Sequence, residues 1–115
     1  MAERKESGTL SIHGSTQIQN ELTSLAGVLG RKWNLVIIDR LLRNGPLGFS
    51  DLLNDIDGIS SKVLSESLDD LEESGFVDRN IVNERPVRVE YSLTHRAVAI
   101  EPLIEKVREG TLSTA

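Results

Sequence analysis

Apolar residues recur at three- and four-residue intervals through much of this chain, which is the spacing of amphipathic helices. The first such stripe predicts a helix over residues 18–29. A wider apolar sector over residues 33–42 predicts a central helix, which Arg31 and Lys32 begin and the turn sequence NGP at residues 44–46 ends. Two helices with faces this apolar are expected to pack into a common core.

Two shorter helices are predicted next, separated by a tight turn. Residues 49–56 carry apolar side chains on one face, with Ser50 available as an N-cap, and Asp57-Gly58 forms the turn. The following helix starts at Ser60, whose side chain can cap it. Its buried stripe consists of Leu64, Leu68 and Leu71. Two short helices joined in this way form a helix-turn-helix.

A β-hairpin is predicted after Gly75, which closes the preceding helix as a left-handed C-cap. The segments FVDRNIVN (76–83) and VRVEYSLT (87–94) flank the tip ERP. Apolar and polar residues alternate along the second segment, which predicts one buried and one wet face. The buried face would carry Val87, Val89, Tyr91 and Leu93. The hairpin therefore has the form of a two-stranded wing.

The last predicted helix follows Thr94, a possible N-cap, and holds more apolar positions than a small core requires. Pro102 either kinks this helix or restarts it. The order of elements is that of a winged helix-turn-helix, a mainly α fold of the α+β class with additional helices at both ends. We therefore expect a mobile polar tail over residues 1–16, one winged-helix domain over residues 17–110 and a short tail over residues 111–115.

Composition narrows the possible functions. At 115 residues and 12.7 kDa the chain forms one domain, and the absence of cysteine excludes disulfides, thiolate metal sites and thiol redox sensing. His13 and His95 have no metal-ligand spacing around them, so we expect no metal. No apolar run reaches the roughly 20 residues of a membrane span, and the start lacks a signal peptide. We therefore expect a cytoplasmic protein.

Catalytic motifs are not visible in the sequence. There is no nucleophile elbow, no phosphate-cradling glycine loop and no close arrangement of histidine and carboxylate. Trp33 and Tyr91 occupy positions of apolar periodicity, so we expect them to pack in the core or in a dimer interface rather than to stack on bases. We expect neither enzymatic activity nor a cofactor.

Three stretches carry a resemblance to a known family: GRKWNLVIIDRLL (30–42), GFSDLLNDIDGISSKVLSESLDDLEESGFV (48–77) and RPVRVEYSLT (85–94). In this order they are similar to the HxlR family of MarR-like winged helix-turn-helix transcriptional regulators. The resemblance implies a homodimer that binds double-stranded DNA, with the second helix of the helix-turn-helix, the recognition helix, in the major groove and the wing beside it. It also implies that the terminal helices form the dimer interface, through Leu22, Leu25, Leu29, Leu103, Ile104 and Val107.

The chain departs from the usual pattern of that family in three places. Gly48 stands where an arginine often precedes the phenylalanine, which removes a possible phosphate contact. Glu66, Ser67 and Asp69 replace basic or amide residues midway along the recognition helix. The cysteine through which several members sense oxidants or electrophiles is absent, so that switch does not carry over. A small-molecule effector stays unidentified.

Charge decides which residues can approach DNA, because eighteen acidic against thirteen basic residues leave a net charge of −5. The acidic residues of the recognition helix gather in its C-terminal half, whereas the N-terminal turn is the end that docks against bases. The residues we expect to contact DNA there are Ser60, Ser61, Lys62 and Ser65. Further candidates are the wing arginines Arg79, Arg85 and Arg88, and also Arg31 and Lys32.

Each group of candidates has an alternative interpretation. The recognition helix could be an ordinary solvated helix, and Arg79 and Arg88 could pair with neighbouring acids. Arg31 and Lys32 could instead lie along the core. We interpret the chain as a homodimeric regulator of a pseudo-palindromic operator. The alternative is an acidic winged-helix module that binds a basic protein and no DNA.

Overall fold

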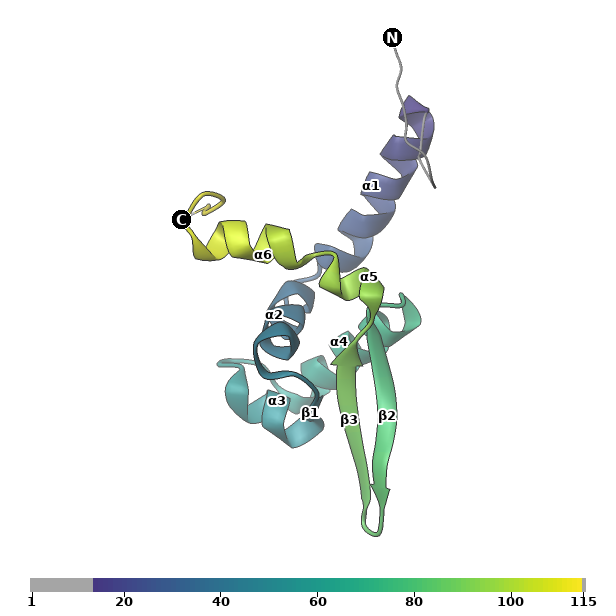
Figure 1. Ribbon diagram of the computed structural model, residues 1–115, viewed down its shortest axis with the longest axis vertical. Helices are drawn as coiled ribbons and strands as arrows, with labels where there is room; N and C mark the ends of the chain where they lie inside the picture. Colours follow the sequence, from purple (N-terminus) through teal and green to yellow (C-terminus); the bar gives the residue numbers. More distant parts are fainter. Residues whose placement is uncertain (1–13, 115) are drawn as a thin grey trace.

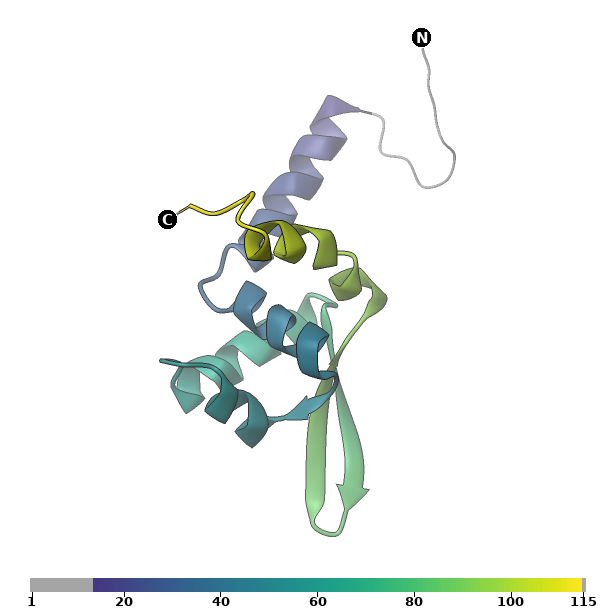
Figure 2. The same cartoon turned by 60° about the vertical axis from the view of Figure 1, so that its left-hand side comes forward.

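The computed structural model describes residues 14–114 of the chain. As the sequence predicts, the fold is a winged helix, mainly α with one small antiparallel sheet (Figures 1 and 2). The polar tail predicted over residues 1–16 lies mostly outside the described residues, and its last two residues belong to the first helix. The elements are α1 (Ser15–Leu29), α2 (Asn34–Asn44), β1 (Leu47–Gly48), α3 (Phe49–Asp55), α4 (Ser61–Glu73), β2 (Val77–Glu84), β3 (Val87–Leu93), α5 (His95–Val98) and α6 (Glu101–Arg108).

The core forms where α2 and α4 turn their apolar stripes inwards. Ile37 and Ile38 of α2 are fully buried, and Phe76 closes the core behind α4. The stripe predicted for α4 is confirmed, because all three of its leucines are buried: Leu64, Leu68 and Leu71. Burial stabilises each such side chain by about 1.5–3 kcal/mol. The inner face of α4 is therefore anchored, and its outer face remains at the surface.

Both ends of α4 are fixed by the residues that the sequence indicates. The Ser60 hydroxyl accepts a hydrogen bond from the backbone N–H of Val63 at 3.1 Å, as an N-cap does. At the other end, Gly75 has a φ of +81°, a conformation that costs glycine little. The next N–H, that of Phe76, then donates to the carbonyl of Leu71 at 2.8 Å. Both boundaries of the helix that the sequence predicts between Ser60 and Gly75 are therefore confirmed.

The segment before α3 differs from the prediction in two ways. Ser50 does not cap α3, because the helix already begins at Phe49; the N-cap is Gly48, whose N–H donates to the carboxylate of Asp51 at 3.2 Å. In addition, a strand of two residues, β1, pairs with β3, with Leu47 opposite Tyr91. A strand this short has no periodicity by which the sequence could reveal it.

The start of α2 also differs from the prediction. Arg31 and Lys32 do not begin this helix but lie in the connection between α1 and α2. The reason is a turn over residues 30–33, in which the N–H of Asn34 donates to the carbonyl of Arg31 at 3.2 Å. Helical geometry therefore begins only at Asn34, whose side chain turns into the core.

The hairpin of β2 and β3 extends beyond the helices, with sheet order β1-β3-β2 (Figure 1). Val77 pairs with Leu93 at its base, and a register shift falls between Ile81 and Asn83. The expected buried face exists only near the base, where Tyr91 and Leu93 pack partly against the core, whereas Val87 is 68% exposed. The alternation of residues predicts the strands correctly but not how far they reach past the core.

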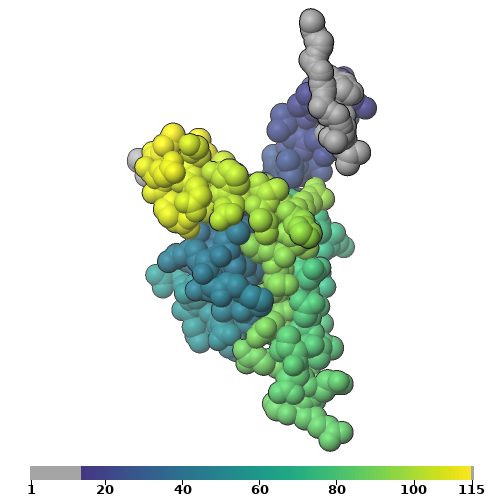
Figure 3. Space-filling view, viewed as in Figure 1, coloured from purple at the N-terminus to yellow at the C-terminus, as the bar shows by residue number. Residues whose placement is uncertain are grey.

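The two terminal helices meet the body differently, since α6 packs on α2 through the buried Ile104. The first, α1, stands away from the rest and has no buried residue (Figures 1 and 3). At the other end, Thr94 caps α5 as predicted, accepting from the N–H of Ala97 at 3.4 Å. Pro102 lies in the first turn of α6, so it restarts the helix rather than kinking it. Within residues 14–114, no helix has the length and apolarity needed to cross a membrane.

The substitution Leu68→Ala tests this placement of the core. It should lower the free energy of unfolding by about 2–5 kcal/mol, because it leaves a cavity in a packed interior. Denaturant titration followed by circular dichroism measures the loss. Leu112→Ala is the matched control, since Leu112 is 48% exposed, and it should cost less than about 1 kcal/mol. Equal losses in the two variants would contradict the assignment of Leu68 to the core.

Candidate nucleic-acid interface

The first turn of α4 presents a polar surface with one positive charge. Ser61, Lys62 and Ser65 are exposed, because the leucine stripe holds the opposite face of the helix in the core. The first N–H groups of a helix have no partner within it, and Ser60 satisfies only that of Val63. Together with the helix dipole, these groups give the end of α4 a positive character that suits phosphate or the acceptor atoms of a base.

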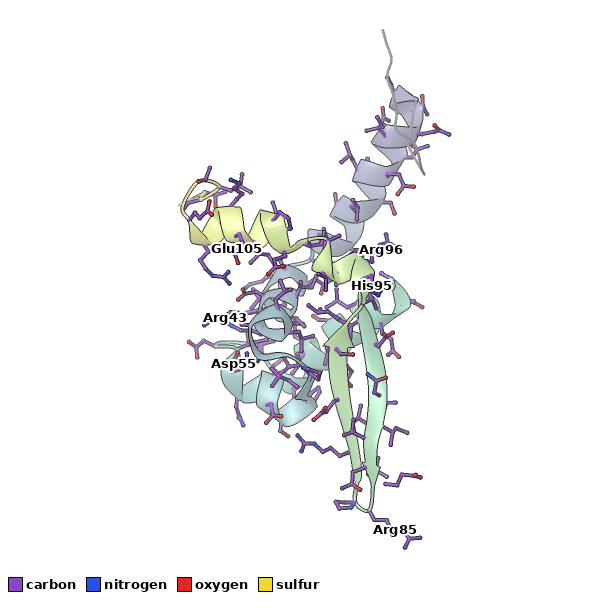
Figure 4. All side chains as sticks on the ribbon, in the orientation of Figure 1. Arg43, Asp55, Arg85, His95, Arg96 and Glu105 are labelled. Carbon is purple, nitrogen blue, oxygen red and sulfur yellow. The ribbon has the colours of Figure 1, made fainter. Side chains whose placement is uncertain are left out.

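Carboxylates neutralise several of the basic side chains near α2 and α6. The carboxylate of Asp39 lies within ion-pair distance of three guanidinium groups, those of Arg40, Arg43 and Arg108, at 3.7, 3.8 and 2.6 Å. Arg108 also pairs with Glu105. Figure 4 shows Arg43 and Glu105 on this side of the molecule, away from the tip of the hairpin. These arginines therefore add little positive field to the outer surface of α4.

Arg31 and Lys32 are occupied by contacts within the chain. The Nε atom of Arg31 lies 3.4 Å from the carboxylate of Asp70, and the Nζ atom of Lys32 lies 5.2 Å from the centre of the Trp33 ring. Arg31 also borders a shallow acidic hollow of about 500 Å³, which is lined by Arg31, Glu66, Asp69, Asp70, Glu72 and Glu73. Five carboxylates around one guanidinium make a poor surface for phosphate.

Among residues 14–114, three other basic residues make no ion pair and no contact with an aromatic ring. We call Lys62, Arg79 and Arg85 the free cations. Lys62 lies at the start of α4, Arg79 on β2 and Arg85 at the hairpin tip, where Figure 4 shows its side chain extending away from the body. Their charges are available to a ligand, and all three belong to the elements that a winged helix presents to DNA.

Arg88, the remaining wing candidate, is paired. Its guanidinium lies 3.5 Å from the carboxylate of Asp51 on α3 and 3.5 Å from that of Glu90 on its own strand. The alternative of a charge pair therefore holds for Arg88, although no such pair forms at Arg79 in the described part of the chain. Both ion pairs are partly exposed, so each contributes little to stability.

The acidic half of α4 lies at the opposite end of the hairpin from the tip. The helix ends at Glu73, and β2 begins at Val77, which pairs with Leu93 at the base of the hairpin. The tip at Arg85 is the far end of the two strands (Figure 1). The negative surface of the C-terminal half of α4 therefore lies near the base of the hairpin, whereas the free cation Arg85 lies at its tip.

Two features of this region are missed by reasoning from the sequence. The outer hairpin exposes the aliphatic side chains of Ile81, Val82 and Val87, of which the alternating pattern assigns only Val87 to a buried face. Asn34 is fully buried and joins two other helices, and no motif or spacing marks it. No group of histidine and carboxylate side chains within residues 14–114 is arranged to hold a metal ion.

Comparison with known proteins gives a consistent result. The family model described as HxlR-like helix-turn-helix matches residues 28–111. The HTH-type transcriptional regulator YodB of Bacillus subtilis is 34% identical over 88 residues, which are 76% of this chain and 78% of that protein. The uncharacterized HTH-type transcriptional regulator YvaP of the same organism is 39% identical over 80 residues, 70% of this chain and 73% of the relative.

Solved structures agree with these relatives. The reduced form of YodB from B. subtilis superposes with a TM-score of 0.69 at 34% identity, covering 77% of this chain and 86% of that one. A MarR-family transcriptional regulator from Enterococcus faecalis V583 gives a TM-score of 0.73 at 28% identity and covers 91% of both chains. The residues that the family model matches, 28–111, include the helix-turn-helix and the wing, where the candidate DNA-contact residues lie.

Proposed function

The chain belongs to the HxlR-like helix-turn-helix family of transcriptional regulators, and on that premise we propose that it acts as a homodimer on a pseudo-palindromic DNA operator. The observation that carries this proposal is the position of the free cations. Lys62, Arg79 and Arg85 lie on α4 and the wing, whereas the ion-paired arginines near Asp39 lie elsewhere. Each free cation that meets a phosphate releases counterions, which favours binding.

We propose that the start of α4 enters the major groove. The hydroxyls of Ser61 and Ser65 can donate to or accept from base edges, while the ammonium of Lys62 approaches a phosphate. Ser60 positions this turn through its capping bond to Val63. Glu66, one turn further along, can accept a hydrogen bond from the exocyclic amine of cytosine, which would make it a residue of base selection.

The wing then contacts the neighbouring DNA backbone or minor groove. Arg85 is best placed for this contact because it lies at the tip with no carboxylate partner in the described chain, and Arg79 supports it from β2. Arg88 has a different part in the proposal. Its pair with Asp51 ties the wing to α3, and its pair with Glu90 on the same strand further reduces the charge that it can offer. Arg31 and Lys32 are the weakest of the expected contacts.

The homodimer accounts for apolar surface that one chain leaves uncovered. Leu22 of α1 is 60% exposed, and Leu103 and Val107 of α6 are 38% and 52% exposed. A helix that stands away from the body with an uncovered apolar stripe needs a partner to be stable in water. Leu25 and Leu29 lie partly against the core, and Ile104 is buried within the protomer. Of the six residues expected at the dimer interface, Ile104 is therefore the one that is buried in the core of the protomer instead.

An acidic module that binds a basic protein is not favoured as an alternative. The comparisons place the chain among transcriptional regulators. The free cations at the start of α4 and on the wing would also have no role in docking a basic partner. We propose no cofactor and no enzymatic step.

DNA binding is tested with a mobility-shift titration of the DNA upstream of the chain's own gene. The wild-type protein should retard it, and Lys62→Ala and Arg85→Ala should each raise Kd roughly tenfold, because each removes one phosphate contact per protomer. Lys106→Ala is the matched control. Lys106 is exposed but pairs with Glu109 on α6, so this variant should bind as the wild type does.

Three results would count against this proposal. A folded dimer that retards no DNA at any salt concentration would contradict DNA binding itself. Equal affinities for wild type and Lys62→Ala would remove Lys62 from the interface. A loss at Lys106→Ala as large as at Lys62→Ala would show that total charge, rather than the position of the free cations, governs binding.

The dimer is tested by placing charge on the exposed apolar faces. Leu22→Glu and Val107→Glu should each shift the protein from dimer to monomer at micromolar concentration, because a buried unpaired carboxylate is costly. Sedimentation velocity gives the mass. Val82→Glu on the wing, at a residue that is 50% exposed, should leave the dimer intact. Dimers of unchanged stability in both terminal-helix variants would contradict this interface.

A further inference from the structure

Asn34 is the one buried polar residue in the described part of the chain, and it is 0% exposed. Its Nδ2 atom donates to the carbonyl of Val28 near the end of α1 and to the carboxylate of Asp70 on α4, each at 2.8 Å. Arg31 holds the same carboxylate oxygen from the outside at 3.4 Å. A single side chain at the start of α2 thus joins α1, α2 and α4.

The orientation of this amide is fixed by its partners. The Val28 carbonyl and the Asp70 carboxylate can only accept, so the NH₂ group of Asn34 must face both of them. The Oδ1 atom is then left inside the protein with no hydrogen-bond partner among residues 14–114. Burying an unsatisfied acceptor is unfavourable, and an apolar side chain at this position would avoid that cost. Stability alone therefore does not explain an asparagine here.

The hydrogen bonds of Asn34 bear on the direction in which α1 leaves the body. The α1 helix has no buried residue, and the structure shows it standing away from the body (Figures 1 and 2), so few contacts define its angle. The two hydrogen bonds of Asn34 attach the end of this helix to Asp70, a residue of the recognition helix. Buried polar groups can select one arrangement among several of similar packing energy.

We infer that Asn34 is a positioning residue, which fixes the direction of the dimerisation helix α1 relative to the recognition helix α4. This inference rests on the proposed function, because in a homodimer that direction sets the distance between the two recognition helices. It therefore determines which separation of operator half-sites the dimer accepts. Asn34 touches no base and no phosphate, and it acts through the helices that it joins.

The link that Asn34 makes between α1 and α4 can be removed without leaving the carboxylate of Asp70 unpaired. The Val28 carbonyl also accepts from the N–H of Arg31 at 3.4 Å, and Asp70 keeps its pair with Arg31. Asn34→Leu fills a similar volume and removes the unsatisfied acceptor, so it should fold. Asp70→Ala breaks the same link from the side of α4 and serves as an independent second variant. The matched control is Asn44→Leu, because among residues 14–114 the side chain of Asn44 bonds only to the carbonyl of Arg40 within α2.

The first measurement uses operators whose half-site separation is changed by one or two base pairs. The wild type should prefer one separation by at least tenfold over its neighbours, as the fixed geometry of a dimer requires. In Asn34→Leu and Asp70→Ala the preference should fall below about threefold. Affinity for a single half-site should stay unchanged in Asn34→Leu, whereas Asp70→Ala also releases Arg31 and is compared by its preference alone. Asn44→Leu should keep the wild-type preference.

The second measurement needs no DNA. The chain has no cysteine, so Glu21→Cys on α1 and Glu72→Cys on α4, both exposed, can carry spin labels in a background of unlabelled protein. Pulsed EPR should give one narrow distance distribution within the wild-type chain and a distribution at least twice as wide after Asn34→Leu or Asp70→Ala. Unchanged widths in both variants would overturn the inference. Wider distance distributions with an unchanged half-site preference would also overturn the inference. Absence of DNA binding by the wild type would instead contradict the proposed function.

Discussion

A chain with a net charge of −5 can present one face to a polyanion only if its carboxylates are neutralised or directed elsewhere. Ion pairs meet this constraint in part, since Asp39 is shared by three arginines and Asp70 is held by Arg31. Four of the five acids of α4 lie in its second half, and together with Glu66 they line the hollow beside Arg31. What remains for DNA is a small set of cations at the first turn of α4 and along the wing.

The fold holds these few cations in a defined arrangement. The leucine stripe of α4 anchors the recognition helix, so its first turn is presented rigidly. The terminal helices carry the uncovered apolar surface that a second copy can cover, and Asn34 connects α1 to Asp70. In the proposed homodimer, two protomers would offer twice the charge of one at a fixed separation. The free cations, the apolar surface for dimerisation and the direction of α1 therefore act together in the proposed homodimer.

Features that depend on neighbours in sequence could be predicted, and features that depend on distant residues could not. The cap at Ser60 and the left-handed turn at Gly75 are local, so the boundaries of α4 follow from the sequence. One partner of Arg88 is Asp51, 37 residues away, and the bond from Asn34 to Asp70 spans 36 residues. No periodicity reports such pairs. The alternation of the wing likewise gives the strands but not their exposure.

The dependence of wild-type DNA affinity on salt concentration tests the central claim most directly. Three free cations in each of two protomers predict that log K falls with log salt concentration at a slope of about −5, close to −0.9 for each phosphate neutralised. Fluorescence anisotropy with a labelled operator, measured over a series of potassium concentrations, gives this slope. A slope shallower than about −2, with the dimer intact throughout, would contradict the account, because the free cations would then not be meeting phosphates.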